Sequence, residues 1–264
     1  MTQLRHLQLT ILEIMRDVDE LCKKNHIEYY LLGGSALGAI RHKGFIPWDD
    51  DLDICMNHKN YCKFIKIAKR ELDPHKYYVQ EALVDWPLNY SKIKLKGTKI
   101  IEHEGYTNEE GGNGIFVDIF RLDNSPSCKT SQIVQYFFAK LYLCYLLSVR
   151  TYKSASLGKR LLILLSFPLK WEPIRLAVRW AIERFNTKET SFYGFFYGRT
   201  RFRNCFMSKE TYGTPFRVPF EDMMLPVPER YHDYLTHLFG DYLTPPPVDQ
   251  QVGLHCIEVD FGKY

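Results

Sequence analysis

Asp49, Asp51 and Asp53 stand at every second position, a spacing that has chemical meaning. On a continuous extended backbone, alternate side chains project from one face about 7 Å apart, so the three carboxylates would lie together. Crowded carboxylates need a cation, and hard divalent ions bind one or two carboxylates plus substrate phosphates. We therefore predict a site for Mg²⁺, or for Mn²⁺, that assists phosphoryl transfer. A solvated acidic edge strand is the alternative, which the apolar Leu52 and Ile54 disfavour.

The tripeptide Gly33-Gly34-Ser35 stands where a strand-like run gives way to a helix-like one. Glycine there lets backbone N–H groups approach a phosphate, and the serine hydroxyl adds a donor. Two glycines alone more often mark only a turn, and neither a G-x-G-x-x-G nor a P-loop pattern is present. The tripeptide becomes a candidate substrate site because Asp51 and Asp53 follow fewer than twenty residues on.

Cationic side chains follow the tripeptide at Arg41-His42-Lys43, and Arg41 and His42 could hold diphosphate oxygens. Ordinary surface charge explains them equally well. Lys92 and Lys94 alternate with apolar residues, so they share a strand face and could flank the phosphate site. Exposed lysines on an edge strand are an equally good explanation.

Asp118 is a lone carboxylate in the very apolar run 115–120. Burying an unpaired carboxylate is costly, so such a residue needs a partner. It is a candidate third metal ligand or general base. A buried structural ion pair is the other interpretation.

The periodicity of apolar residues predicts the elements that position these side chains. Helices are expected over 4–21, from 35 onward, and over 59–72, the last closed by Pro74. Strands are expected over 27–32, 51–56, 77–82, 90–95 and 115–120. This order indicates an α+β protein with a mixed sheet flanked by helices.

From about residue 131 the sequence pattern predicts long helices, interrupted at Gly158, Pro168 and Pro173. The last part is rich in proline and aromatic residues and has one short helix expected over 230–239. We predict a catalytic core over 1–130, an inserted helical subdomain over 131–210, and a C-terminal segment, 211–264, that completes the core.

Composition limits the class of protein. The chain has 264 residues, 45% hydrophobic, and a net charge of +4, too small to indicate nucleic-acid binding. Seven scattered cysteines without zinc spacing indicate reduced thiols in the cytoplasm. Charged residues break the N-terminal run, which disfavours a signal peptide. The apolar stretch 133–149 falls short of the roughly 20 residues of a membrane span, which disfavours a transmembrane helix.

Several motifs together resemble the LicD family, which includes bacterial phosphocholine transferases and is similar to the catalytic domain of fukutin-related protein. The matching runs are LGGSALG (32–38), Arg41-His42, GFIPWDDDLDI (44–54), YSKIK (90–94), GIFVDIF (114–120), and, near the C-terminus, Phe220-Glu221 and LPVP (225–228). Residues 131–210 match nothing in the family pattern. Arg121 stands where the family usually has proline, a departure expected to affect the loop more than the chemistry.

The resemblance implies a nucleotidyltransferase-type core in which Gly34 and Ser35 contact donor phosphates. It implies that Asp51 and Asp53 hold Mg²⁺ and that Asp118 completes the carboxylate triad. The implied donor is CDP-choline or a related CDP-alcohol. A sugar hydroxyl of a cell-surface glycan, lipid-linked glycan or teichoic-acid precursor would attack the phosphorus bearing choline and release CMP. Asp118 is then the expected base.

Three questions stay open on the sequence. The same parts would serve a nucleotidyltransferase that moves NMP from an NTP, or a non-catalytic binding protein on the same fold. The aromatic side chains that would select choline, and the oligomeric state, cannot be chosen. The helical segment 131–185, apolar and basic, could rest on the inner face of the plasma membrane, or could pack on the core or a second subunit.

Overall fold

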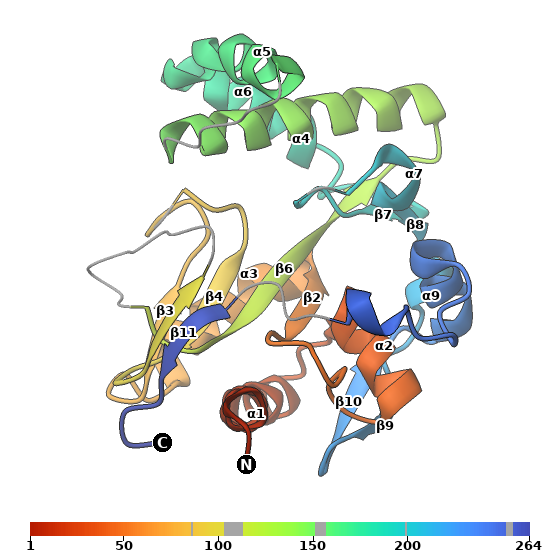
Figure 1. The fold of residues 1–264 in the computed structure, drawn as a ribbon. Coiled ribbons are helices and arrows are strands. Elements are labelled where there is room, and N and C mark those ends of the chain that lie inside the picture. The colour runs from red at the N-terminus through yellow and green to blue at the C-terminus, as the bar shows by residue number, and fades with distance from the viewer. Residues whose placement is uncertain (86, 103–112, 151–156, 199, 252–255) are drawn as a thin grey trace. The chain divides into compact units, whose positions relative to one another are not determined.

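The fold is seen in a computed structural model that describes residues 1–85, 87–102, 113–150, 157–198, 200–251 and 256–264 (Figure 1). It divides into two compact units. The first comprises Met1–Trp86, Tyr90–Arg121 and Thr211–Tyr264, and the second Pro87–Asn89 and Leu122–Glu210. Helices and a curled sheet are both present, so the predicted α+β class is confirmed. The three-domain division of the sequence stays a prediction.

The sheet of the first unit has the strand order β1-β2-β6-β4-β3. The strands are β1 (Tyr30–Leu31), β2 (Asp53–Asn57), β6 (Phe116–Ser125), β4 (Ser91–Leu95) and β3 (Tyr77–Gln80). β1 pairs antiparallel with β2, and β4 pairs antiparallel with both β3 and β6. β4 is therefore an interior strand.

Helices α1 (Gln3–Lys24) and α3 (His58–Glu71) pack on each other and on this sheet. The predicted apolar stripe of α1 is confirmed, because Ile11, Ile14 and Val18 are completely or almost completely buried. Tyr61 of α3 shares a 2.6 Å hydrogen bond with Ser91 of β4. Since side chains alternate along a strand, Lys92 and Lys94 lie on the face opposite to α3.

The C-terminal part of the first unit contains the helix expected over 230–239 and adds strands that sequence patterns missed. The strands β9 (Phe216–Phe220) and β10 (Met223–Val227) form a hairpin that contacts β1 and the helix α2 (Gly33–His42). The helix α9 (Tyr231–Phe239) also packs on α2. A separate ladder joins β5 (Lys99–Glu102) to β11 (Cys256–Asp260). Prolines at 219 and 226 hid the hairpin, because proline is rare in strands other than edges.

The second unit is built around the long helix α4 (Lys129–Val149), with α5 (Leu157–Leu165), the 3₁₀ helix η1 (Phe167–Lys170) and α6 (Glu172–Glu183) packed along it (Figure 1). Gln135 ties α4 in place by donating to the carbonyl oxygens of Asn124 and Ile182. The short strand β7 (Phe192–Gly194) pairs with the end of β6 and with β8 (Phe206–Ser208). The single-turn helices α7 (Phe202–Cys205) and α8 (Lys209–Tyr212) flank β8.

Several predicted boundaries were wrong for local reasons. The strand expected over 27–32 shrinks to β1, because the Ile27 N–H donates to Cys22 and prolongs the end of α1. The strand expected over 51–56 begins only at Asp53. The break expected at Gly158 falls inside α5, whereas Pro168 lies in η1 and Pro173 opens α6 as expected.

Candidate active site

The Gly33-Gly34-Ser35 tripeptide forms the first turn of α2 instead of a turn that precedes a helix. Gly33 has φ +50°, a left-handed conformation that glycine adopts without strain. A Cβ added to Gly34 would lie 3.2 Å from Oδ2 of Asp49. The two glycines thus permit a close approach of the acidic segment to the helix N-terminus, where backbone N–H groups and the helix dipole favour anions.

Ser35 connects the first turn of α2 to Asp53 in β2, one of the predicted metal ligands. Its side chain is buried, and Oγ accepts a 2.9 Å hydrogen bond from the backbone N–H of Asp53. On the other side of the turn, the Leu32 N–H donates to the carbonyl oxygen of Asp53 at 3.0 Å. Both ends of the Asp53 backbone unit are therefore held by residues next to the tripeptide.

The acidic segment is not one continuous strand, which corrects the geometric argument from alternation. Asp49 and Asp51 precede β2, and only Asp53 lies in it. Gln8 of α1 holds the segment by donating to the carbonyl oxygen of Asp49 at 2.9 Å. The buried Leu52 accepts from the backbone N–H of Asp118 at 3.1 Å. Tertiary contacts, not strand periodicity alone, hold the carboxylates here.

Negative charge accumulates in this segment. Burial raises the pKa of Asp53 well above its usual value, and the charges of Asp51, Asp118 and Asp49 raise it further. Burial, with Asp51 and Asp50 nearby, likewise raises the pKa of Asp49 to about 8. Among the described residues, no hydrogen-bond donor reaches the buried Oδ1 of Asp53. A buried carboxylate oxygen without a hydrogen-bond donor is costly, and a bound cation would stabilise it.

The carboxylates fit a divalent cation that takes part of its coordination from a substrate. In the described part of the chain, no group of three or more His, Cys, Asp and Glu side chains is arranged to hold a metal by itself. Magnesium sites commonly use one or two carboxylates and complete their shell with phosphate oxygens and water. The unsatisfied Oδ1 of Asp53 is the observation that fits such an ion. The three-carboxylate set of Asp51, Asp53 and Asp118 stays a prediction.

Lys92 and Asp118 face each other across β4 and β6 in direct register. The Nζ atom of Lys92 lies 3.4 Å from Oδ1 of Asp118, and 5% and 11% of the two side chains are exposed. The same ammonium lies 3.2 Å from the ring centroid of Phe116. Lys94, also buried, stands opposite Phe116. The alternative of exposed edge-strand lysines was therefore wrong.

Arg41 and His42 lie at the far end of α2. Arg41 is six positions after Ser35, which amounts to about 9 Å along a helix. The Arg41 guanidinium donates to the carbonyl oxygen of Tyr242 at 3.0 Å and to Nε2 of His42 at 2.9 Å. Burial, and to a lesser degree the neighbouring Arg41 charge, lowers the pKa of His42. The predicted contact of these two residues with a diphosphate stays a prediction.

Two positioning residues escaped the sequence reasoning. Tyr234 of α9 is buried, and its hydroxyl accepts a 3.0 Å hydrogen bond from the backbone N–H of Gly33. Gln8, described above, fixes the acidic segment. Gln8 follows Leu7 on the buried side of α1, and a polar residue at such a position is the one signal that could have indicated a role. Nothing local at Tyr234 predicts a contact 201 positions away.

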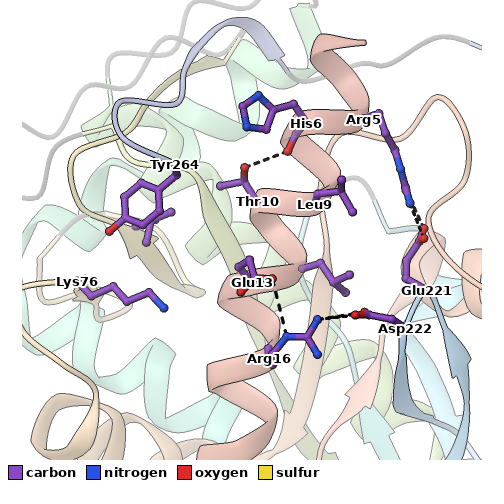
Figure 2. Close-up of a pocket in the computed structure, with 12 residues that line it drawn as sticks. Arg5, His6, Leu9, Thr10, Glu13, Arg16, Lys76, Glu221, Asp222 and Tyr264 are labelled. Carbon is purple, nitrogen blue, oxygen red and sulfur yellow. Dashed lines mark hydrogen bonds and ion pairs between the residues drawn. The ribbon is translucent and has the colours of Figure 1, made fainter. Parts of the chain in front are cut away.

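A cavity of about 700 Å³ lies elsewhere in the first unit, beside α1 (Figure 2). Its charged side chains pair with one another, as in Arg5 with Glu221 at 2.6 Å and Arg16 with Asp222 at 2.9 Å. The lining residues that the structure describes include none of the predicted site residues. The candidate site is therefore the carboxylate face around Asp53.

Comparison with known proteins agrees with this geometry. The profile of the family described as LicD/FKTN/FKRP, nucleotidyltransferase domain, matches residues 26–142. The lipopolysaccharide cholinephosphotransferase LicD of Haemophilus influenzae is 30% identical over 270 residues, which cover 97% of each chain. This chain belongs to the LicD family. The expected resemblance is confirmed, and the family match contains every predicted site residue from Gly33 to Asp118.

Two shorter similarities cover about a fifth of this chain. An uncharacterized protein of Rickettsia typhi is 46% identical over 59 residues, 22% of this chain and 19% of the relative. One of Rickettsia prowazekii is 48% identical over 52 residues, 20% of each. The Haemophilus relative, in contrast, extends over the helical second unit as well. The second unit is thus included in the similarity to LicD, whereas the family profile reaches only its first part, up to residue 142.

Proposed function

We propose that this LicD-family phosphotransferase moves phosphocholine, or a similar phospho-alcohol, from a CDP-alcohol to a sugar hydroxyl. The acceptor would belong to lipopolysaccharide, a teichoic-acid precursor or another cell-surface glycan, and CMP would be released. The buried carboxylate Asp53, next to the N-terminus of α2, is the observation that carries the proposal. Similarity to a protein named as a lipopolysaccharide cholinephosphotransferase supports the choice of group and acceptor.

The first turn of α2 would bind the donor diphosphate. Gly34 and Ser35 lie in the first turn of a ten-residue helix, where the Gly34 N–H, the Ser35 hydroxyl and the helix dipole would stabilise an anion. The backbone N–H of Ser35 itself donates to the carbonyl oxygen of Leu32 at 3.0 Å. The buried Lys92 ammonium adds positive charge on the sheet face that carries Asp118. Catalysis of phosphoryl transfer is mostly positioning and charge neutralisation, so these groups suit the reaction.

Asp51 and Asp53 would hold Mg²⁺, with Mn²⁺ as a substitute, and Asp118 lies close enough to raise the pKa of Asp53. The bound cation would polarise the phosphoryl oxygens and offset the negative charge of the diphosphate. Ser35 would orient Asp53 through its backbone hydrogen bond. The orienting contact leaves the carboxylate itself available for the cation.

Asp118 would accept the proton of the attacking sugar hydroxyl. The acceptor oxygen forms the new bond to the phosphorus that bears the alcohol, and the bond from that phosphorus to the CMP oxygen breaks. Lys92, 3.4 Å from Asp118, compensates the negative charge of the base while the acceptor is deprotonated. The leaving electron pair stays on the CMP phosphate.

Product analysis tests the proposal. The protein with Mg²⁺ is incubated with a panel of CDP-alcohols, or with NTPs, with and without a glycan acceptor. Acceptor-dependent CMP from CDP-choline supports the proposal, whereas pyrophosphate from an NTP would establish the rival nucleotidyltransferase. No turnover with any donor, together with tight nucleotide binding, would favour a non-catalytic protein.

Asp118→Asn tests the assignment of the base. We expect turnover to fall about 10²- to 10⁴-fold with Mg²⁺ saturating, because general base catalysis contributes roughly that factor. Asp222→Asn is the matched control, since Asp222 is an exposed carboxylate paired with Arg16 outside the carboxylate face. Near wild-type turnover of Asp118→Asn would show that the base is another group.

We also propose that the enzyme is located in the cytoplasm. The cysteines whose side chains are described, six in number, are all free. Free thiols suit a reducing compartment.

A further inference from the structure

The outer side of α5, η1 and α6 exposes an unusual amount of apolar surface, here called the α5–α6 face. Its large apolar side chains are between 44% and 67% exposed, whereas soluble proteins normally expose such residues singly. They are Leu161, Leu162, Leu164, Leu165, Phe167, Trp171, Leu176 and Trp180. All eight lie within twenty consecutive positions, on α5, on η1, on α6 or between them.

These side chains are not needed for packing inside the unit. Leu169, Val178 and Ile182 already supply the buried side of η1 and α6. Leu161 and Leu165 lie four residues apart on α5, and so do Leu176 and Trp180 on α6, so each pair shares one helix side. The two helices therefore have a second apolar side that the unit itself leaves exposed.

The charge on the same segment has one sign. Positions 157–184 contain six basic residues and two acidic ones, Glu172 and Glu183, so this segment alone carries the net charge of the whole chain. Arg160 and Lys170 are exposed. The Lys170 ammonium lies 4.7 Å from the ring centroid of Phe167, and Arg184 lies 5.6 Å from that of Trp180. Cations thus stand beside the exposed aromatic rings.

We propose that the α5–α6 face binds an anionic lipid surface. Leucine, phenylalanine and tryptophan side chains enter the boundary between headgroups and acyl chains, and lysine and arginine side chains bind lipid phosphates. Trp is the side chain most typical of that boundary. The face does not depend on the transferase reaction, so membrane binding and the proposed function can fail separately.

Two other occupants fit less well. In a symmetric dimer the same patch meets itself, which would bring the six basic residues of each segment 157–184 near those of the other copy with only two acidic residues per copy to compensate them. A membrane span through α4 is the other option, since α4 is a helix in the described ranges with the length and composition to cross a bilayer. Gln135, however, is fully buried within this helix and hydrogen bonded to Ser125 and Ile182. Those contacts indicate a helix that packs inside its unit.

Flotation of the full chain with vesicles tests the proposal. Two vesicle preparations are used, phosphatidylcholine alone and phosphatidylcholine mixed with phosphatidylglycerol, each at low and at high ionic strength. We expect co-flotation with the anionic vesicles, at least tenfold above the neutral ones at low salt and reduced at high salt. No co-flotation at low salt would overturn the proposal.

Variants locate the contact. Leu164→Glu and Trp171→Ala are expected to reduce the bound fraction at least fivefold, since both side chains are about two-thirds exposed and contribute little to folding. Leu243→Glu is the control, because Leu243 is 60% exposed but lies outside the face. Equal losses in the control, or a dimer in light scattering that Leu164→Glu dissociates, would overturn the lipid assignment. Unchanged thermal midpoints of the variants exclude misfolding as the cause.

Discussion

The Ser35 hydroxyl oxygen accepts a 2.9 Å hydrogen bond from the backbone N–H of Asp53, and this contact joins the first turn of α2 to the first residue of β2. The proposed phosphate-binding turn and the proposed metal carboxylate are therefore joined directly by a hydrogen bond. A substitution in the first turn of α2 should therefore alter the position of Asp53, and a substitution at Asp53 should alter the turn.

Ser35→Ala removes both a candidate phosphate donor and the acceptor for the Asp53 N–H. We expect kcat/KM for the CDP-alcohol to fall about 10²- to 10³-fold, the usual cost of losing one well-placed donor. Stability should fall by about 1–3 kcal/mol, because a partly buried N–H is left unsatisfied. Ser148→Ala is the matched control, since the Ser148 hydroxyl donates to a carbonyl oxygen in α4. A loss of stability without a loss of turnover would contradict the catalytic part.

Asp53→Asn should abolish stabilisation by Mg²⁺. In the wild type we expect the thermal midpoint to rise with Mg²⁺, since an ion that binds the folded state alone stabilises it. The amide should remove that rise and at the same time stabilise the metal-free protein, because it relieves a buried like-charge cluster. Differential scanning fluorimetry with a Mg²⁺ series measures both. A Mg²⁺-dependent rise that persists in Asp53→Asn would place the ion elsewhere.

The free energy of unfolding of the metal-free protein should fall as the pH rises from about 4 to 8. Burial and the neighbouring carboxylates raise the pKa of Asp49 to about 8 in the folded protein, whereas the unfolded chain should release this proton near the ordinary pKa of 3.8. Between these pH values the folded state binds more protons than the unfolded state. The contribution of this proton to the free energy of unfolding is therefore complete below about pH 4 and is lost as the pH rises to about 8. Because the nearby charge of Asp51 helps to raise the pKa of Asp49, the transition reflects both carboxylates.

Asp49→Asn should flatten this pH dependence. We expect a gain of about 1–3 kcal/mol over the wild type at pH 8, with each unit of pKa shift corresponding to at most about 1.4 kcal/mol. Urea titrations at several pH values, without metal, measure it. Equal slopes for the variant and the wild type would show that Asp49 does not hold the proton.

Tyr234→Phe removes the acceptor for the Gly33 N–H but keeps the buried ring. We expect stability to fall by about 1–2 kcal/mol, the usual cost of one unsatisfied buried donor. Because the first turn of α2 loses its anchor, KM for the CDP-alcohol should rise more than kcat falls. Tyr231→Phe serves as the control, since Tyr231 lies on the same helix, and stacks on Phe216 without reaching Gly33. An unchanged KM would show that Tyr234 acts on stability alone.

Local sequence patterns correctly predicted part of the fold and indicated the candidate site. The stripe of apolar residues in α1 and the alternation in β4 and β6 determined those elements, because amphipathic periodicity follows from which side must be buried. The order of Gly33-Gly34-Ser35, Asp53 and Asp118 also indicated the candidate site. A lone carboxylate in an apolar strand needs a charged partner, and the structure supplies Lys92.

Only the tertiary structure decided how these residues meet. Whether Lys92 is exposed or buried depends on β4 lying inside the sheet, which its own alternation cannot reveal. The sequence determined the residue types that could bind phosphate and metal. The tertiary structure alone assigned Gln8 to Asp49 and Tyr234 to Gly33, because these hydrogen bonds join segments that local propensity treats as independent.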